Sequence, residues 1–481
     1  MGSNVSLFTV FVIASFWVAT GRSVIIPSAP PSAAADVDPS LLSLSLEFFA
    51  FPEYTTLSTT TNCLDNIAAL RGVQPAIRIG GTTQDRATYD PTLTAPVNYT
   101  VADPTDAPLT LTYGPSFFSL AAQMKGEVTV GLNRQLDNQT NTMEGAKEAL
   151  RRMPNLLAME LGNEPEFWAE TSPIVPPGDT WTPALDGASQ KLWFTDFAPS
   201  IGDMFQAAVY LQYPTWSTAG LIPILESAVT YVKTFSGHSY PQSACGGAST
   251  NLTSLMSHSG IVSYTSQYKP EAAAAHNISK KYFLGETNSA TCGGGGISPT
   301  FGAGLWVMDY VLQGALNNVD RLYFHQGTIA DCPYCFFGQD IVDAPFYGAV
   351  FVSDFLGKDG TKVAMLDDGT GSTGIYAVYG VFGKPLRLLI YNSVYYDGTT
   401  ARTSVSVNFT GISSTTVTAK RMTAQNATAI IGEGGIVTIG GGGSFDTSCQ
   451  SVGTQTLEMV PVAGGAFDVS VAASEALIVY L

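Results

Sequence analysis

Two glutamates each follow a short apolar segment, and the two segments lie far apart in the chain. Residues 156–161 are followed by Gly162-Asn163-Glu164-Pro165, and residues 281–285 are followed by Glu286. Two carboxylates that face each other can act as a general acid and a nucleophile, which is what retaining glycoside hydrolysis requires. Glu164 and Glu286 are therefore the candidate catalytic residues.

Each glutamate also has a plainer interpretation. Glu164 could be a polar residue in the loop before Pro165, and Glu286 could be a surface acid after a strand. Glu160 and Glu166 are weaker candidates, because Glu160 lies inside the apolar segment and Glu166 lies two residues further along. The placement of Glu164 and Glu286 after two separate strands favours the catalytic interpretation of the pair.

The elements that must position these side chains can be predicted from the hydrophobic pattern. Strand-length apolar segments alternate with segments of helical period, which is typical of βαβ units and a parallel sheet. Eight such strands predict a closed (β/α)₈ TIM barrel, with its active site at the C-terminal ends of the strands. The expected strands are 44–49, 76–80, 128–133, 156–161, 215–221, 232–239, 282–285 and 321–325, and the expected helices include 64–70, 117–124, 143–153, 201–211, 222–229, 305–316 and 346–356.

From about Lys362 the pattern changes to short Val/Ile/Thr/Tyr segments separated by Gly, Asn and Asp turns. This pattern predicts an antiparallel β-sandwich. Residues 432–435 and 440–443 are glycine-rich, but no helix follows them, so turns are expected there and not phosphate loops. We expect a signal peptide at 1–21, a linker at 22–42 that could add a strand to the sandwich, a catalytic barrel at 43–360 and a sandwich at 361–481.

Composition excludes several classes of protein. The chain has 22 Lys+Arg against 39 Asp+Glu, a net charge of −17, and only 13% charged residues. Such a chain would repel nucleic acid, and no basic cluster contradicts the total. Its 45% apolar residues can form a large core, which excludes intrinsic disorder.

The amino-terminal segment is apolar from Val5 to Ala19 and is followed by small residues, as in a secretory signal peptide. It is too short to span a bilayer, so we expect a secreted, extracellular protein without stable membrane association. After the leader, six Asn-x-Ser/Thr sequences are candidate glycosylation sites, at Asn98, Asn138, Asn251, Asn277, Asn408 and Asn426.

The six cysteines are an even number compatible with three disulfides, whose pairing the sequence leaves open. Cys332-Pro-Tyr-Cys335 has the spacing of a redox motif, but a local structural disulfide is favoured for a protein outside the cytosol. With only four histidines and no His/Cys cluster, we expect neither a metal site nor a cofactor.

Several motifs together resemble glycoside hydrolase family 79, the family of β-glucuronidases and heparanases, and especially its secreted fungal members. The motifs are Arg78-Ile-Gly-Gly-Thr-Thr-Gln-Asp85-Arg86, Leu161-Gly-Asn-Glu-Pro165, Gly237-His-Ser-Tyr240, Gly285-Glu-Thr-Asn-Ser289 and Phe301-Gly-Ala-Gly-Leu-Trp306. Asn-Glu-Pro alone indicates only a larger superfamily. The aromatics that some bacterial relatives have after the nucleophile are replaced here by residues 289–296.

The resemblance implies a role for individual residues. Glu164 would be the acid/base, Glu286 the nucleophile, Asn163 the partner of the sugar 2-hydroxyl, and Tyr240 a hydrogen-bond donor to Glu286 or, alternatively, an aromatic lid. The other substrate-binding candidates are Glu47 and Asp85, which could instead be cap or loop acids, His325 and Gln326 after the last strand, and Tyr334, whose phenol could meet the substrate carboxylate.

The resulting hypothesis is a retaining exo-glycoside hydrolase that releases terminal β-linked glucuronic acid or 4-O-methylglucuronic acid. Heparan sulfate is densely anionic, and the scarcity of Lys and Arg favours an enzyme that holds one acid group at a time. The alternatives are an endo-β-glucuronidase, a retaining β-glycosidase acting on a neutral sugar, a non-catalytic carbohydrate-binding wall protein, and a redox protein using Cys332 and Cys335.

Overall fold

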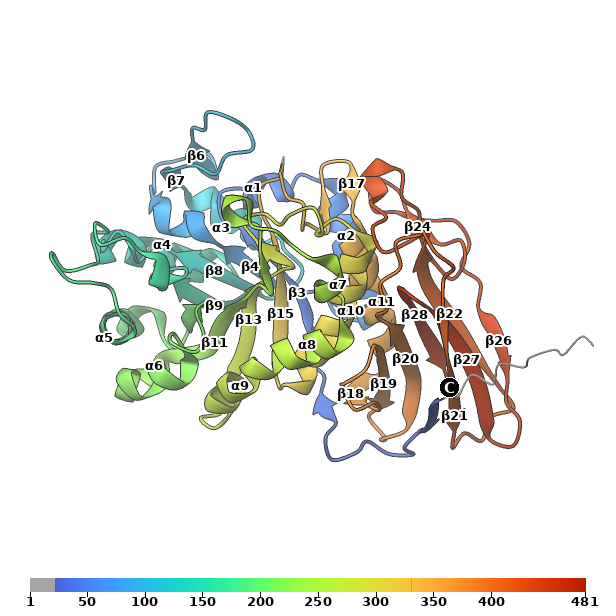
Figure 1. The fold of residues 1–481 in the computed structure, drawn as a ribbon. Coiled ribbons are helices and arrows are strands. Elements are labelled where there is room, and N and C mark those ends of the chain that lie inside the picture. The colour runs from blue at the N-terminus through green and yellow to red at the C-terminus, as the bar shows by residue number, and fades with distance from the viewer. Residues whose placement is uncertain (1–21, 330) are drawn as a thin grey trace, which may run out of the picture.

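The computed structural model describes residues 22–329 and 331–481 (Figure 1). The expected signal peptide, residues 1–21, lies outside this range. Across the described residues, no helix is both long enough and apolar enough to cross a membrane.

Eight parallel strands close into a barrel, as predicted. They follow one another around the barrel in chain order, and the last strand pairs with the first through Leu322 and Leu42. Polar residues such as Arg78, Glu160 and Gln206 alternate with apolar ones along the strands. The barrel strands are β3 (Leu42–Glu47), β4 (Ile77–Gly80), β8 (Val128–Leu132), β9 (Leu156–Leu161), β10 (Phe205–Tyr210), β11 (Val232–Ser239), β13 (Lys281–Thr287) and β15 (Arg321–Gln326).

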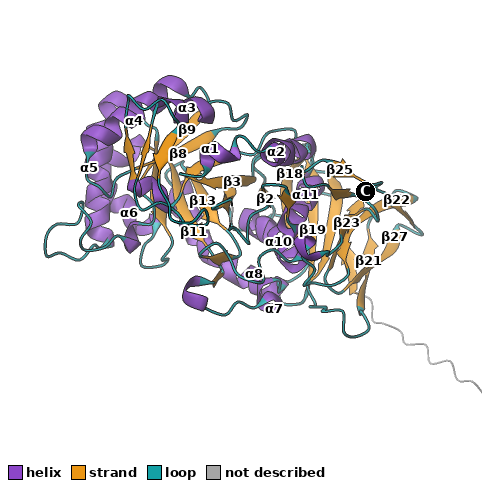
Figure 2. Cartoon of the chain, turned by 90° about the horizontal axis from the view of Figure 1, so that it is seen from above, coloured by secondary structure: helices purple, strands orange, loops and turns teal. Residues whose placement is uncertain are grey.

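Helices surround the barrel, and α2, α10 and α11 lie between it and the second domain (Figures 1 and 2). The longer helices are α2 (Ser58–Arg71), α3 (Pro115–Ala121), α4 (Gln139–Arg152), α5 (Pro183–Ile201), α6 (Thr218–Leu225), α8 (His258–Thr265), α9 (Lys269–His276), α10 (Phe301–Leu316) and α11 (Ala344–Leu356). The one-turn helices α1 (Phe51–Tyr54) and α7 (Leu252–Leu255) lie in loops.

The fifth barrel strand is not where the sequence pattern placed it. The sequence pattern predicted a helix at 201–211, but this segment contains the strand β10. It predicted a strand at 215–221, but the helix α6 begins within this segment, at Thr218. The helix α5 ends at Ile201 because Gly202 adopts φ 82°, and the chain then enters the barrel. A short apolar segment fits a buried strand as well as a helix, so periodicity alone could not separate them.

The carboxy-terminal part is an antiparallel sandwich of two sheets, as predicted. Its larger sheet has the order β2 (Ala35–Asp36), β18 (Gly360–Met365), β19 (Thr373–Gly380), β20 (Pro385–Asn392), β28 (Glu475–Tyr480), β22 (Thr416–Ala424) and β23 (Val437–Ile439), with β26 (Glu458–Pro461) also paired to β22. Its smaller sheet has the order β1 (Arg22–Ile25), β21 (Ser404–Thr410) and β27 (Ala466–Ala472). The segment before the barrel thus contributes one strand to each sheet, with β1 running parallel to β21.

Short two- and three-stranded sheets form within the loops. Those near the barrel are β5 (Ala87–Tyr89) with β7 (Leu111–Tyr113) and β6 (Val97–Tyr99), β12 (Gln242–Ser243) with β14 (Ala290–Thr291), and β16 (Phe337–Gly338) with β17 (Ile341–Val342). The pair of β24 (Ser444–Phe445) and β25 (Ser451–Val452) lies in the sandwich domain.

The larger sandwich sheet is buried on both faces, and its sequence alternates accordingly. In β20, Leu388 and Ile390 belong to the core between the two sheets, whereas Leu389 and Tyr391 belong to the large core shared with the barrel. Successive side chains of a strand point to opposite faces, so one sheet contacts both the smaller sheet and the barrel helices. The two domains therefore share one continuous apolar core.

Three disulfides link segments of the described chain, and none of the six cysteines is free. Cys63–Cys449 joins α2 of the barrel domain to a sandwich loop across 386 residues, and Cys245–Cys292 joins the loops after β11 and β13. Cys332–Cys335 closes a short loop after β15, which confirms the local pairing expected from the sequence. Because Cys63 pairs with Cys449, a covalent bond adds to the apolar contact between the domains.

A buried histidine also connects the two domains. His258 begins α8, and its Nδ1 lies 2.9 Å from Oδ2 of Asp309 on α10. Its Nε2 lies 3.0 Å from Oδ2 of Asp367, in the loop between β18 and β19. Burial lowers the pKa of His258, but the charges of and hydrogen bonds with the two aspartates outweigh burial and raise it to about 10. The imidazolium is thus an ionic link between barrel and sandwich.

Substitution of His258 should destabilise the protein in a pH-dependent way. The pKa of His258 is higher in the folded protein than its ordinary value of about 6.5, so protonation stabilises the fold fully below pH 6.5 and progressively less up to pH 10. We expect His258→Gln to lower the free energy of unfolding by about 3 kcal/mol at pH 6, and by less at pH 10. Denaturant unfolding at both pH values measures this difference.

His276→Gln is the matched control, because His276 is exposed and pairs with Asp320 at 2.8 Å. An exposed ion pair contributes at most about 1 kcal/mol. A loss of stability in His258→Gln that is equal at pH 6 and pH 10 would contradict the ionic link.

Candidate active site

A cavity of about 950 Å³ opens at the C-terminal ends of the barrel strands. It is lined by residues from the loops after seven of the eight strands, with β8 as the exception among the described residues. Its floor carries both candidate catalytic residues, Glu164 and Glu286, and its walls carry Glu47, Tyr240, His325 and Tyr334. The site therefore lies where a TIM barrel places its chemistry.

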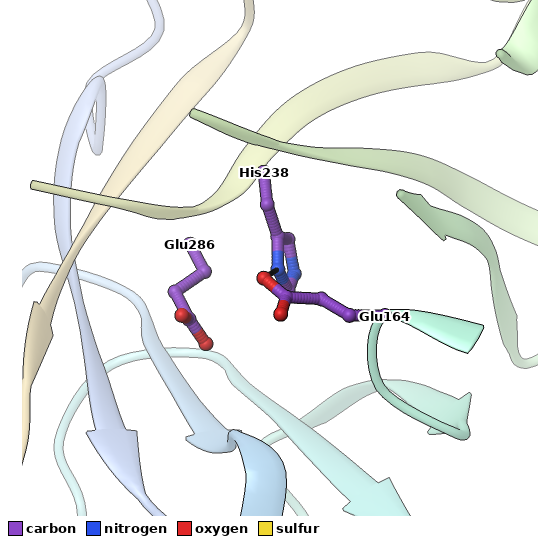
Figure 3. A group of neighbouring side chains, drawn as sticks. All are labelled: Glu164, His238 and Glu286. Atoms are coloured by element: carbon purple, nitrogen blue, oxygen red, sulfur yellow. Dashed lines mark hydrogen bonds and ion pairs between the residues drawn. The ribbon is translucent and has the colours of Figure 1, made fainter. Parts of the chain in front are cut away.

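The side chains of the two glutamates extend toward each other beside His238 (Figure 3). Glu164 follows β9, Glu286 lies near the end of β13, and one carboxylate oxygen of each lies within 4.8 Å of the other and of a ring nitrogen of His238. Carboxyl groups about 5–5.5 Å apart are typical of retaining glycosidases, whereas inverting enzymes need about 6.5–9.5 Å. The separation fits the retaining geometry.

The backbone at Glu164 adopts an unusual conformation. Its φ is 43° and its ψ is 60°, in the left-handed region that residues with a side chain seldom occupy. The flanking structure holds it there, since Glu164 N donates to Val209 O at 3.2 Å and Pro165 begins a short 3₁₀ turn. Such strain is often found at functional sites, where the fold fixes a side chain in one direction.

Glu286 is surrounded by donors and positive charge. Arg78 Nη1 donates to its Oε2 at 2.6 Å, the Tyr240 hydroxyl donates to its Oε1 at 2.7 Å, and His325 Nδ1 lies 3.7 Å from Oε2. Burial raises the pKa of Glu286, but the charges of His325, His238 and Arg78 and the Tyr240 hydrogen bond outweigh burial and hold it well below its usual range. Glu286 is therefore ionised, as a nucleophile must be.

Arg78 is a functional residue to which the sequence analysis assigned no role. Its side chain is buried, and besides Glu286 it contacts Glu160 through Nη2 at 2.5 Å and Asn163 Oδ1 at 2.8 Å. The signal was present, because a charged residue inside an apolar strand requires a buried partner. Glu160 is such a partner of Arg78, and its Oε2 also accepts from Gln206 Nε2 at 2.7 Å. Glu160 therefore holds Arg78 in position.

His238, in β11, is the second residue without an assigned role. Its Nδ1 lies 2.8 Å from Oε1 of Glu164, and its Nε2 is buried without a hydrogen-bond partner in the described chain. Burial lowers the pKa of His238, but the charges of Glu286 and Glu164 and the Glu164 hydrogen bond raise it above the usual value. Its motif position, two residues before Tyr240, could have revealed it.

Glu164, His238 and Glu286 could in principle hold a metal ion, because each offers one ligand atom. The surroundings argue against this use. Arg78 already places a positive charge 2.6 Å from Glu286, and His238 Nδ1 is engaged with Glu164 at 2.8 Å. A cation here would face the guanidinium at close range, so the cluster fits an acid and a nucleophile better than a ligand set.

Four predicted binding residues line the cavity. Glu47 accepts from Thr83 N at 3.1 Å and lies 3.2 Å from His325 Nε2, which ties the first and last strands of the barrel together. Tyr334 has its ring 6.3 Å from that of Tyr240 and 6.1 Å from that of His325. Three aromatic rings therefore form one side of the cavity above Glu286.

Three other predicted residues are buried beside the cavity and do not line it. Asn163 Oδ1 accepts a hydrogen bond from Arg78, which leaves the Nδ2 of Asn163 as a donor. Asp85 accepts from Asn163 N at 2.7 Å and from Trp168 Nε1 at 3.2 Å, and burial raises its pKa to about 6. Gln326 accepts from Phe336 N at 2.8 Å and donates to backbone carbonyls. Asp85 and Gln326 thus hold the loops and lie outside the cavity where sugar contacts were expected.

Two disulfides stabilise the wall formed by the loops after β11, β13 and β15. Cys245 and Cys292 are bonded to each other and both line the cavity. Tyr334 lies between Cys332 and Cys335, and its N donates to Gly293 O at 3.3 Å, which joins the two loops. The phenol of Tyr334 is therefore held on a covalently closed loop.

The candidate glycosylation sites differ in exposure. The side chains at Asn98, Asn138, Asn251 and Asn277 are exposed, and those at Asn408 and Asn426 are half-buried in the sandwich. Asn138 and Asn251 also cap helices α4 and α7 through their side chains.

Known proteins are similar to this chain over most of its length. The profile of the "Glycosyl hydrolase family 79 C-terminal beta domain" matches residues 375–478. A β-glucuronidase of Aspergillus niger is 30% identical over 415 residues, which cover 77% of this chain and 75% of that protein. A β-glucuronidase of Neurospora crassa is 28% identical over 477 residues, covering 81% and 82%.

The chain belongs to glycoside hydrolase family 79. A solved structure supports the same assignment, namely the 4-O-α-L-rhamnosyl-β-D-glucuronidase of Fusarium oxysporum 12S in complex with Rha-GlcA. It is 43% identical with a TM-score of 0.92 and covers 95% of this chain and 100% of its own. This family 79 protein is thus an enzyme that hydrolyses glycosidic bonds, and the alternatives of a wall protein or a redox protein fall away.

Removal of the Tyr240 hydroxyl tests the electrostatics of this family 79 site. Its hydrogen bond lowers the pKa of Glu286, so Tyr240→Phe should raise that pKa. We expect kcat to fall about tenfold and the acid limb of the kcat/KM profile to move to higher pH. Rates on an aryl glycoside substrate measured between pH 3 and pH 7 would show the change.

Tyr264→Phe is the matched control. Tyr264 lines the same cavity, but its hydroxyl contacts Ser239 and Tyr268 and not Glu286. The acid limb of the kcat/KM profile of Tyr264→Phe should stay in place. A shift of equal size in both variants would refute the role of Tyr240.

Proposed function

We propose that this enzyme is a retaining exo-β-glucuronidase that releases a terminal β-linked glucuronic acid or 4-O-methylglucuronic acid. The observation that carries the proposal is the pair Glu164 and Glu286 at retaining separation, beneath a cavity with tyrosine and histidine walls. The names of the fungal relatives agree with a glucuronide substrate.

In the first step, Glu286 attacks the anomeric carbon while Glu164 donates its proton to the leaving oxygen. The bond from the anomeric carbon to the aglycone breaks, and an ester between the sugar and Glu286 forms. Arg78 and Tyr240 keep Glu286 ionised until it attacks. Asn163, whose Oδ1 is fixed by Arg78, has its Nδ2 available for the sugar 2-hydroxyl.

In the second step, Glu164 acts as the base. It takes a proton from water, and the resulting hydroxide attacks the anomeric carbon and displaces Glu286. His238 is hydrogen-bonded to Glu164 at 2.8 Å and fixes the direction of its carboxylate. Two inversions at the anomeric carbon give net retention.

The substrate carboxylate is assigned to the aromatic wall. Tyr334 is buried and lines the cavity beside Tyr240 and His325, and its hydroxyl can donate to a carboxylate. Glu47 lies on β3, the neighbour of the strand that carries His325, and suits a sugar hydroxyl. One phenol on a rigid loop can recognise one acid group without a cluster of basic residues.

The charges of the lining favour exo action on a singly charged sugar. Among the described residues of the cavity, Arg86 and His325 are the basic side chains, whereas Glu47, Glu164, Glu286 and Asp331 are acidic. A sulfated polyanion would meet repulsion along such a cleft. An endo-acting, heparanase-like activity is therefore not favoured.

A second candidate substrate is a glucuronate that carries a sugar on its 4-hydroxyl. The cavity volume of about 950 Å³ is at the upper end of the range of about 300–1,000 Å³ for ligand pockets, which leaves room beyond one sugar ring. The Fusarium oxysporum relative, with its rhamnosyl-glucuronate complex, is 43% identical. Comparing aryl glucuronides with and without a 4-O-rhamnosyl group decides between the two.

The enzyme is proposed to act outside the cell. Three disulfides and four exposed glycosylation sequences suit an oxidising, secretory route. Amino-terminal sequencing of protein recovered from culture medium would test the expected cleavage after residue 21.

Substitution of the two glutamates should separate their roles. Glu164→Ala is expected to lower kcat by about 10²–10⁴-fold on an aryl glucuronide with a poor leaving group, and by less with a good one. Azide should then attack the glycosyl-enzyme and give the β-glucuronyl azide. Glu286→Ala should abolish turnover, and azide in place of the nucleophile should give the α-azide. Rate measurements and NMR of the products distinguish these results.

Glu170→Gln is the matched control, because Glu170 is an exposed acid on the loop that carries Glu164. It should keep its full rate. Near-normal hydrolysis of aryl glucuronides by both alanine variants would disprove the assignment.

Substitution of Tyr334 tests recognition of the carboxylate. Tyr334→Phe should raise KM for an aryl glucuronide by roughly 10–100-fold, because a hydrogen bond to a charged group is worth about 1.5–3 kcal/mol. KM for the matching aryl glucoside, which has no carboxylate, should change little. An equal change for both substrates would show that Tyr334 does not read the acid group.

A further inference from the structure

A second cavity of about 630 Å³ lies beside the catalytic one. It is built from the loop after β4, which includes the small sheet β5, β6 and β7, and from the loops after β8 and β9. This sheet lies at the top left of Figure 1. The cavity therefore occupies the part of the barrel mouth above β8, which the catalytic cavity leaves free.

The lining of the second cavity has the chemistry of a sugar site. It presents hydroxyl and amide side chains, and Leu109, 82% exposed, lies at its edge. Tyr99 adds an aromatic ring, held edge-on against Phe49 with the ring centroids 5.3 Å apart. Neutral donors and acceptors beside an aromatic ring suit a neutral carbohydrate. The hydroxyl and amide side chains include Thr88, Thr100, Thr110, Thr112 and Gln135.

Arg86 connects the two cavities. Its side chain lines both, and its Nη1 donates to Pro108 O at 2.8 Å. On one side of Pro108, Thr105 and Ala107 line the catalytic cavity, and on the other side Leu109 lines the second cavity. The Arg86 side chain and the loop around Pro108 therefore form the boundary between the two cavities.

The second cavity is also coupled to the acid/base loop. Asp85 lies in its wall and accepts from Asn163 N at 2.7 Å, the residue directly before Glu164. Asp85 also accepts from Arg134 N at 3.1 Å, after β8. The wall of this cavity and the catalytic loop therefore share one hydrogen-bonded support.

We propose that the second cavity is a subsite for a neutral sugar chain attached to the glucuronate unit. The proposal rests on the proposed function, since it assumes a glucuronide in the first cavity. The chain reaches the subsite either from the 4-hydroxyl of the glucuronate or from its anomeric oxygen. The chemistry of recognition is the same in both cases, and the substrates below distinguish them.

Asn98 adds a competitor within the same cavity. It lines the cavity, is exposed, and begins the sequence Asn98-Tyr-Thr100. A glycan on Asn98 would enter the subsite, so the test uses Asn98→Gln as the background for every variant. Thr110 and Thr171 are exposed residues of the lining at which a large side chain would fill the cavity.

The experiment compares three substrates: an aryl β-glucuronide, a terminal β-glucuronate on a neutral hexose tetrasaccharide, and an aryl glucuronide with a neutral sugar on its 4-hydroxyl. Thr110→Trp and Thr171→Trp should each raise KM about tenfold for one extended substrate, with kcat little changed, because about 1.4 kcal/mol of binding is lost. The affected substrate shows from which end the chain enters. The simple aryl glucuronide should be unaffected.

Thr400→Trp, at an exposed turn of the sandwich, is the matched control and should change none of the constants. Unchanged KM for both extended substrates, with normal hydrolysis of the aryl glucuronide, would overturn the subsite and leave the proposed function intact. An equal loss on all three substrates would also overturn it. Absence of glucuronide hydrolysis by the unsubstituted enzyme would instead overturn the proposed function and the subsite with it.

Discussion

The buried guanidinium of Arg78 is the interaction on which the active site depends. It joins three barrel strands, because it comes from β4 and contacts Glu160 on β9, Asn163 after β9 and Glu286 on β13. Burial alone would lower its pKa, but the charges of Glu160 and Glu286 raise it, so the guanidinium stays ionised. Removing one partner of such a pair costs about 3–5 kcal/mol because the other charge stays buried.

This arrangement has a chemical consequence. Arg78 has two carboxylate partners, and one of them, Glu160, is fully buried and makes no contact with the cavity. The other, Glu286, lines the cavity. In the proposed mechanism, Glu160 would still balance the charge of Arg78 when Glu286 becomes an ester. A residue that looked like a weaker catalytic candidate thus has a supporting role.

The loops around the active site also differ in how firmly they are held. Cys245–Cys292 and Cys332–Cys335 close the wall on the side of β11, β13 and β15, where the aromatic side chains lie. The opposite side, around the small sheet of β5, β6 and β7, has no disulfide among the described residues and carries the second cavity. At the side of the barrel, α10, α11 and the His258 link fix the barrel to the sandwich. The wall that carries the aromatic side chains is therefore the wall that two disulfides constrain.

The sequence by itself predicted the architecture, and it singled out the two glutamates that the proposed mechanism uses. Alternating strands and helices predicted the barrel, the change of pattern near Lys362 predicted the sandwich, and Glu164 and Glu286 were identified because each follows a strand. The local disulfide Cys332–Cys335 was also predictable, since its partners are three residues apart. All of these depend on contacts close in sequence or on a repeated period.

Only the tertiary structure decided the partners of those residues. Arg78 and Glu286 are 208 residues apart, Glu164 and His238 are 74 apart, and Cys63 and Cys449 are 386 apart. No local pattern encodes such pairs, because barrel closure brings them together. The fifth strand was misplaced for a related reason: a buried apolar segment such as 205–210 satisfies either period, and burial within the barrel selects the strand. Asp85 and Gln326 were predicted after barrel strands in the same way. Their side chains accept hydrogen bonds from backbone N–H groups and do not line the catalytic cavity.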